Sequence, residues 1–190
     1  MMTIDDMVSQ VAQITGVAPK QQPDTKPEVK PEIIREAVKT EIKSPVNLRM
    51  KPAIGLSLAK EITYCIEKAA EMIGVNVVIA IADEGGRLIL LEAMDDSFIA
   101  SIKAAEDKAF TAVALKMPTH EALEASRGGA LDGYTNGNGI LMLAGGVPVK
   151  YGNSIIGGIG VSGGTKDQDM TLAYTGLTYF EERIKTCNNN

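Results

Sequence analysis

Residues 77–92 read VVIAIADEGGRLILLE and give the clearest structural signal in the chain. Two runs rich in aliphatic side chains, at 77–82 and 87–92, each have the length of a β-strand. Between them lies Asp-Glu-Gly-Gly, a combination that favours tight turns. Because a four-residue turn joins two strand-like runs, the stretch predicts a β-hairpin.

Helical patterns lie on both sides of this hairpin. Apolar residues recur at three- and four-residue spacing over 56–73, and Gly74 follows as a stop signal. Three more helices are expected, an alanine-rich one at 98–116, a short one opening at Thr119 and a last one at 167–184. Further strands are expected at 139–143, 147–151 and 154–161. Since the strands come in adjacent groups separated by helices, the pattern predicts an α+β domain whose antiparallel sheet is flanked by helices.

Glycine is concentrated in one part of the chain, with 13 of the 19 glycines between Gly128 and Gly164. A dinucleotide-binding GxGxxG motif needs a strand before it and a helix opening directly on it. Here Gly158, Gly160 and Gly163 have the GxGxxG spacing but fall largely inside an expected strand, and the sequence has no GxxxxGK[ST] phosphate loop. Glycine inside a strand lets another backbone or a flat ligand approach closely. We therefore interpret the glycines as close-approach positions.

Composition narrows the class of protein. The chain is 45% hydrophobic and 23% charged, with a formal net charge of −5. The absence of a long apolar run excludes a membrane-spanning helix, and an isoelectric point near 5.0 argues against a nucleic-acid partner. Cys65, Cys187 and the single His120 cannot form a four-ligand zinc site within one chain. We expect one soluble, intracellular domain with a tail.

The first 45 residues differ from the rest and contain five of the eight prolines. Residues 1–17 predict an amphipathic helix, and residues 18–45 form a Pro-rich, charged linker that includes a second short helical pattern at 32–43. The folded domain is expected at 46–187. A short amphipathic helix on a tether is typical of docking on a partner surface, with packing on its own domain as the alternative.

Two side chains are candidates for ligand binding or acid–base chemistry on the sequence pattern alone. Lys108 lies on the small-residue face of the 98–116 helix, where it could meet a carboxylate or phosphate; the alternative is an ion pair with a neighbour such as Glu106. His120 follows a Pro-Thr pair at a helix start and is a candidate ligand or acid–base group. A catalytic pair of Cys65 and His120 finds no activating neighbour in the sequence, and Ser162 is one residue out of the GxSxG motif.

Three runs together resemble the HbpS/GlcG-like family, which also supplies the C-terminal domain of the propanediol-utilisation corrinoid adenosyltransferase. They are VVIAIADEGGRLILLEAMDD at 77–96, IKAAEDKAFTAVALKMPTHEAL at 102–123 and AGGVPVKYGNSIIGGIGVSGGTKDQDMTLAYTGL at 144–177. The resemblance extends over roughly residues 54–185. It implies a profilin- or PAS-like fold, assembly into homo-oligomers, and a tetrapyrrole, haem or a corrinoid, as the ligand.

The resemblance also implies an iron ligand on the first helix of the domain, where haem-binding members carry a histidine. That helix reads LSLAKEITYCIEKAAEMIG here and contains no histidine. The candidate iron ligands are therefore Tyr64, Cys65 and His120, since tyrosine and cysteine thiolate are both known axial ligands of haem. The candidate cofactor contacts are Lys108, Thr111, His120, Gly145 and Gly146.

The expected function is that of a tetrapyrrole-binding accessory protein, more plausibly a binder than an enzyme, in a bacterial microcompartment pathway. Its expected partners are further copies of itself and, through residues 1–17, the shell or other cargo, with neither nucleic acid nor membrane. The expected location is the cytoplasm, inside the microcompartment. Two alternatives stay open: an enzyme that acts on a small metabolite or degrades haem in the same pocket, and an oligomeric scaffold without a ligand.

Overall fold

A computed structural model describes residue 32, residues 35–36 and residues 50–188. The expected helix at 1–17 and nearly all of the linker at 18–45 lie outside the described residues. The chain divides into two units, residues 1–48 and 49–190, and the second is the folded domain described below.

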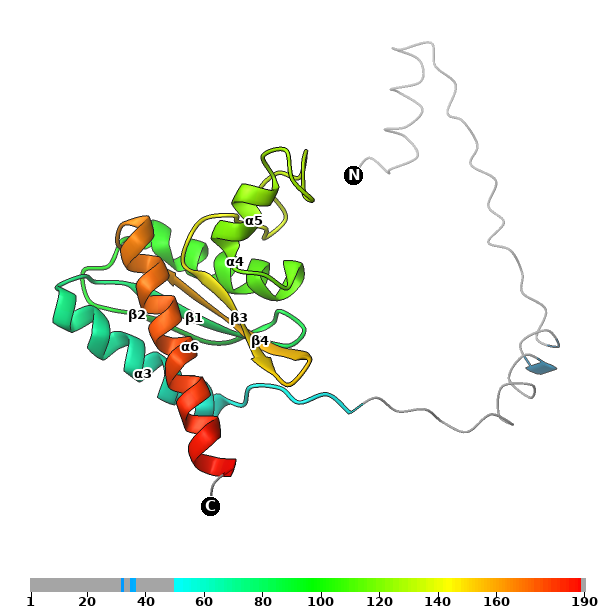
Figure 1. Ribbon diagram of the computed structural model, residues 1–190, viewed down its shortest axis with the longest axis horizontal. Coiled ribbons are helices and arrows are strands. Elements are labelled where there is room, and N and C mark those ends of the chain that lie inside the picture. The colour runs from blue at the N-terminus through cyan, green and yellow to red at the C-terminus, as the bar shows by residue number, and fades with distance from the viewer. Residues whose placement is uncertain (1–31, 33–34, 37–49, 189–190) are drawn as a thin grey trace, which may run out of the picture. The chain divides into compact units, whose positions relative to one another are not determined.

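The domain contains four described helices and four described strands, and every strand pair is antiparallel. The strand order in the sheet is β2-β1-β4-β3 (Figure 1). The predicted α+β class and the antiparallel sheet are therefore confirmed. The elements are α3 (Leu56–Ile73), β1 (Val78–Asp83), β2 (Leu88–Ala93), α4 (Ile99–Leu115), α5 (Thr119–Ala125), β3 (Gly146–Tyr151), β4 (Ser154–Ser162) and α6 (Lys166–Asn188).

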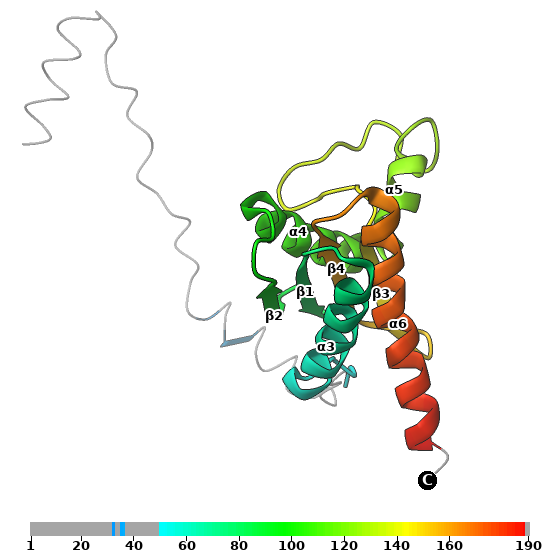
Figure 2. The same ribbon diagram turned by 90° about the vertical axis from the view of Figure 1, so that its left-hand side faces the viewer.

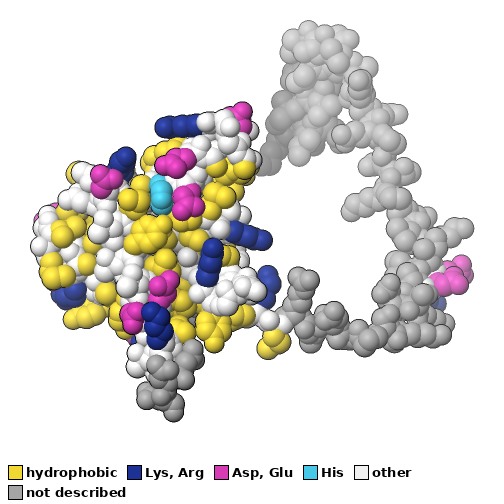
Figure 3. Space-filling model, in the orientation of Figure 1, with side chains coloured by type: hydrophobic (Ala, Val, Ile, Leu, Met, Phe, Trp, Pro, Cys, Tyr) yellow, Lys and Arg dark blue, Asp and Glu magenta, His cyan; other side chains and the backbone are white. Residues whose placement is uncertain are grey.

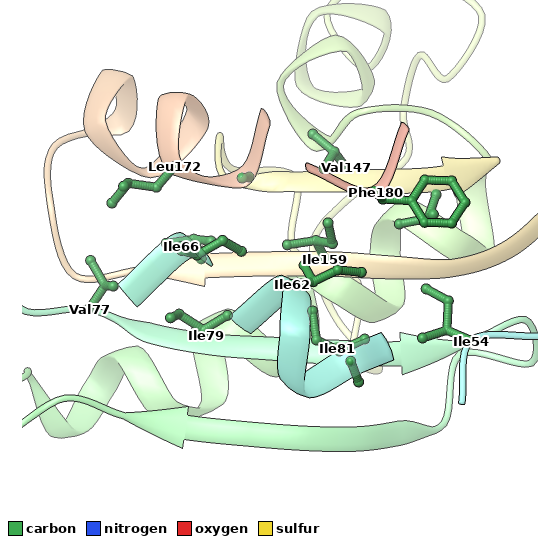
Figure 4. Close-up of a cluster of buried hydrophobic side chains, with 14 of the residues drawn as sticks. Ile54, Ile62, Ile66, Val77, Ile79, Ile81, Val147, Ile159, Leu172 and Phe180 are labelled. Carbon is green, nitrogen blue, oxygen red and sulfur yellow. The ribbon is translucent and has the colours of Figure 1, made fainter. Parts of the chain in front are cut away.

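Helices cover both faces of the sheet (Figure 2). One face packs against α3 and α6, and the main hydrophobic core lies between these layers. Figure 4 shows Ile62 and Ile66 of α3 meeting Ile79 of β1, Ile159 of β4 and Leu172 of α6. The other face packs against α4 through a smaller cluster of mostly alanine and valine side chains. Small side chains on this second face let α4 lie close to the sheet.

The predicted hairpin forms as β1 and β2, with a register shift between Ile81 and Ala82. Asp83 closes its turn, because one carboxylate oxygen accepts hydrogen bonds from the backbone N–H groups of Gly85 and Arg87 at 2.8 and 2.9 Å. Gly86 follows at φ +77°, the left-handed region that glycine tolerates best. Local sequence was sufficient to specify this turn.

The strand expected at 139–143 does not form, and this prediction is wrong. In this segment Leu141 N–H donates to the hydroxyl oxygen of Thr111 at 2.7 Å, and Met142 N–H donates to the side-chain oxygen of Asn136 at 2.9 Å. A single bridge between Gly137 and Ile140 is all the strand-like pairing there. Because side chains bond these amides, they do not join the sheet ladder.

The glycines of β4 are confirmed as close-approach positions, and the approaching group is the backbone of α4. A Cβ atom added at Gly160 would lie 2.0 Å from the carbonyl oxygen of Ala105, and one added at Gly158 would lie 2.5 Å from that of Ala109. Real Cβ atoms do not come so near a backbone oxygen, so any side chain here would push α4 off the sheet.

Candidate functional site

An open groove of about 650 Å³ runs along α6 beside α3, and its volume is within the usual range of small-molecule sites. Hydrophobic side chains gather on this face over α6, next to the single histidine (Figure 3). We call it the α3–α6 groove. Its lining residues are Cys65 of α3 and Met170, Thr171, Tyr174, Thr175, Thr178, Tyr179 and Glu182 of α6.

Cys65 is the α3 side chain that lines the groove. It lies one residue before Ile66, which is fully buried in the main core, so the helix fixes the direction of the thiol. The thiol is half-buried, and burial raises its pKa. The neighbouring Tyr64 is 61% exposed and is not a lining residue, and the Lys68 ammonium lies 5.5 Å from its ring centroid. Of the two ligand candidates on this helix, Cys65 alone lines the groove.

His120 does not line the groove, but its ring contacts the ring of a lining residue. Its ring meets the Tyr174 ring edge-on, with 6.3 Å between the centroids, and Tyr174 is a lining residue. The Nδ1 atom of His120 is buried and has no hydrogen-bond partner among the described residues. Burial, and then the negative charge of Glu121, raises the pKa of the Tyr174 hydroxyl, which favours the neutral phenol.

A polar bridge joins the two helices further along the groove. The Tyr179 hydroxyl donates to Glu61 Oε2 at 3.0 Å, and Arg183 Nε donates to the same oxygen at 3.1 Å. These hydrogen bonds lower the pKa of the Glu61 carboxyl, and the one from Arg183 has the larger effect. Since Glu61 belongs to α3 and the other two residues to α6, the bridge joins the two helices beside the groove.

Lys108 is not paired with Glu106, the neighbour considered in the sequence. Its ammonium donates to Asp169 Oδ2 at 2.7 Å and to the Val161 carbonyl at 2.8 Å, while Asp169 Oδ1 accepts from Gly164 N–H at 2.8 Å. Burial lowers the pKa of Lys108, and Asp169 opposes that shift. With the Lys108 side chain only 4% exposed, this cluster ties α4 to β4 and α6.

Thr111, Gly145 and Gly146 also occupy structural positions. Gly146 N–H donates to the Thr119 hydroxyl at 2.9 Å, and Thr111 holds residue 141 as described above. Gly145 has φ +110°, and an added Cβ would lie 3.1 Å from Lys108 Nζ. The structure therefore brings Lys108, Gly145 and Gly146 together in one cluster, and none of the candidate cofactor contacts lines the groove.

Sequence reasoning missed most of the groove. Met170, Tyr174 and Thr178 follow one another at four-residue spacing on α6, and that spacing was the available signal for a second exposed face. Asp169 lies within the 144–177 run that resembles the family, and nothing in the sequence marks it as the partner of Lys108. No described helix is long and apolar enough to cross a membrane. Within the same residues, no three His, Cys, Asp or Glu side chains gather as a metal site.

The comparisons with known proteins agree with this architecture. A family described as "Haem degrading protein HbpS-like" matches residues 54–178, which include every described strand and the first half of α6. The chain belongs to the HbpS-like family. The match begins at Ile54, whose N–H donates to the Ile156 carbonyl of β4 at 3.0 Å. The matched residues therefore lie within the folded domain, residues 49–190.

Two related proteins and one solved structure give the sequence identity and the share of each chain that is similar. An uncharacterised 15.0 kDa protein of Citrobacter freundii is 42% identical over 132 residues, 68% of this chain and 93% of that protein. The corrinoid adenosyltransferase PduO of Citrobacter freundii is 34% identical over 139 residues, 70% of this chain but only 41% of PduO. A crystal structure of a PduOC:heme complex is 32% identical with a TM-score of 0.63, covering 67% of this chain and 94% of that one.

Proposed function

We propose that this protein binds a tetrapyrrole in the α3–α6 groove, with Cys65 as the axial donor. The observation that carries the proposal is the position of Cys65, the only lining residue from α3, beside a groove large enough for a small cofactor. The solved PduOC:heme complex supports it, because that structure contains a related domain together with haem. When bound, haem would supply redox or ligand-sensing chemistry at its iron.

The residues present fit a tetrapyrrole. The macrocycle is a broad apolar disc, and the rings of Tyr174 and Tyr179 with the Met170 side chain offer it apolar contact. The Cys65 thiol would lose its proton on binding iron, since a coordinating thiol is deprotonated. The unpartnered Nδ1 of His120 lies next to Tyr174 and makes this histidine the second candidate donor.

The charge of the groove bears on which tetrapyrrole is bound. Glu182 is its one charged lining residue, and no lining residue is cationic. The lining therefore offers haem propionates no counter-charge, whereas the hydroxyl oxygens of Thr171, Thr175 and Thr178 could accept hydrogen bonds from the neutral amides of a corrinoid. Haem and cobalamin are both tested for this reason.

Haem titration followed by its Soret band tests the proposal. We expect a stoichiometric spectral change for the full chain. We expect Cys65→Ser to weaken binding by about tenfold or more, because even the loss of an outer-shell partner of a metal ligand costs about 10–100-fold. Cys187→Ser is the matched control, because Cys187 is exposed and outside the groove. Cobalamin is titrated in a second arm, and size-exclusion chromatography in parallel gives the self-association that the family resemblance implies.

The pH dependence separates Cys65 from His120 as the donor. Because burial raises the pKa of the Cys65 thiol, binding must displace its proton at neutral pH. Affinity should then rise with pH by up to about tenfold per unit, until the pH reaches the thiol pKa. Cys65→His should restore binding with a shifted Soret band and remove this dependence. Unchanged affinity and spectrum in Cys65→Ser would disprove the assignment, and no spectral change with haem or cobalamin would disprove the function.

We also propose that residues 1–17 direct the protein to a bacterial microcompartment. The support is the amphipathic pattern of this segment followed by a Pro-rich tether. A fluorescent reporter fused to residues 1–20 should form puncta in shell-producing cells. The same fusion carrying Val8→Ser and Val11→Ser, which breaks the apolar stripe, should remain diffuse. A diffuse signal from the unmodified fusion would rule out targeting by this segment.

A further inference from the structure

A second open pocket, of about 510 Å³, lies at the surface beside α4 and shares no lining residue with the α3–α6 groove. We call it the loop pocket, because the segment 133–140 forms most of its wall. Phe110 and Ala114 of α4 contribute the rest. Its remaining lining residues are Gly133, Tyr134, Thr135, Asn136, Gly137, Asn138 and Ile140.

The wall of the loop pocket is held in place by its own hydrogen bonds. The 141 and 142 backbone N–H groups are bonded to Thr111 and Asn136 as described above, and residues 137 and 140 form a two-way backbone bridge. Asn138 has φ +52°, a conformation that asparagine tolerates better than most residues. These hydrogen bonds reduce the conformational entropy that this part of the wall loses when a ligand binds.

The ring of Phe110 is also fixed. An added Cβ at Gly86 would lie 2.8 Å from Cδ2 of the ring, and one at Gly139 would lie 3.4 Å from Cδ1. The hairpin turn and the 133–140 segment therefore meet opposite edges of this ring. A rigid aromatic side chain in a pocket is a surface on which the C–H groups of a ring-shaped ligand can pack.

The chemistry of the lining indicates the class of ligand. Every polar lining side chain is neutral: the phenol of Tyr134, the hydroxyl of Thr135 and the amides of Asn136 and Asn138. The nearby Asp107 carboxylate is already paired with Lys103. A charged ligand would find no partner charge among these side chains, whereas hydroxyl groups can exchange hydrogen bonds with amides and hydroxyls.

We propose that the loop pocket binds a neutral, polyhydroxylated molecule of about the size of a monosaccharide, with Phe110 as the apolar platform and Tyr134 and Asn138 as hydrogen-bonding groups. This site shares no lining residue with the α3–α6 groove. It gives the protein a second ligand of a different chemical class.

NMR titration of the 15N-labelled full chain tests this proposal. The probes are D-glucose, D-mannitol and glycerol, with D-glucose 6-phosphate as the charged comparator. We expect saturable shifts in residues 133–140 with at least one neutral polyol, and binding of glucose 6-phosphate that is weaker by about tenfold or more. Asn138→Gly removes the amide in a backbone conformation that glycine accepts, and Tyr134→Ala removes the phenol; each should reduce the affinity several-fold.

Tyr151→Ala is the control, because Tyr151 is 46% exposed, close to the 48% of Tyr134, and does not line the loop pocket. It should bind the polyol as the parent chain does. The proposal is overturned if none of the neutral probes shifts residues 133–140 at high millimolar concentration. It is also overturned if glucose 6-phosphate binds as well as glucose, or if the two loop variants bind as tightly as Tyr151→Ala.

Discussion

Gly160→Ala is expected to destabilise the folded domain by about 3 kcal/mol or more. The added methyl group would lie 2.0 Å from the Ala105 carbonyl oxygen and 2.6 Å from the Ala109 backbone nitrogen. Both atoms belong to the backbone of α4, so no side-chain rotation can relieve the contact. Either α4 moves away from the sheet or β4 bends, and each loses packing on that face. Urea unfolding followed by circular dichroism measures the loss.

Gly55→Ala is the matched control for this substitution. A Cβ at Gly55 would meet no atom within 4 Å, and its backbone φ of −89° suits any residue. We expect its stability to change by no more than about 1 kcal/mol in either direction. If Gly160→Ala unfolds at the same urea concentration as Gly55→Ala, the close approach of α4 to β4 is not a stabilising contact and our account of the glycines fails.

Lys108→Met is expected to cost about 3–5 kcal/mol of folding stability, the range found when one partner of a buried ion pair is removed. The Asp169 carboxylate would remain buried with its Gly164 hydrogen bond but without its counter-charge. Because the pair joins α4 to the first turn of α6, its loss should also loosen the start of the helix that lines the groove. Chemical denaturation gives the cost, and amide hydrogen exchange in α6 locates it.

A double-mutant cycle separates the charge from the packing. Asp169→Asn keeps an oxygen that can accept from Gly164 N–H while removing the charge, so Lys108→Met with Asp169→Asn should be more stable than Lys108→Met alone. Lys103→Met is the control, because that lysine is 66% exposed and its ion pairs lie at the surface. It should cost less than about 1 kcal/mol. Strictly additive effects at Lys108 and Asp169 would contradict a coupled buried pair.

Local sequence predicted those parts of the fold that short-range forces control. The 77–92 hairpin needs only two strand-like runs and an Asp/Gly turn, and the end of α3 needs only Gly74, which adopts φ +66° as expected of a helix stop. The same reasoning predicted a strand at 139–143, and this prediction was wrong. Its apolar side chains resemble those of a strand, but the groups that bond its amides come from Thr111 on α4 and from Asn136.

The candidate site was less predictable than the fold. Tyr64 and Cys65 are adjacent on one helix and equally reasonable as iron ligands in the sequence. Successive residues on a helix point about 100° apart, so only one of them can face a given neighbour. The packing of α6 beside α3 decides that Cys65 lines the groove while Tyr64 is exposed.

The sequence by itself determined the α+β class, the hairpin, the helix boundaries near Gly74 and Pro118, and membership of the HbpS-like family, since these depend on local periodicity and on ordered motifs. The tertiary structure decided that Lys108 pairs with Asp169, 61 residues away, and that the groove is built almost entirely from α6. The physical reason is the strand order β2-β1-β4-β3. Long-range pairing of β1 with β4 places the first and last helices of the domain side by side, and no local pattern encodes that neighbourhood.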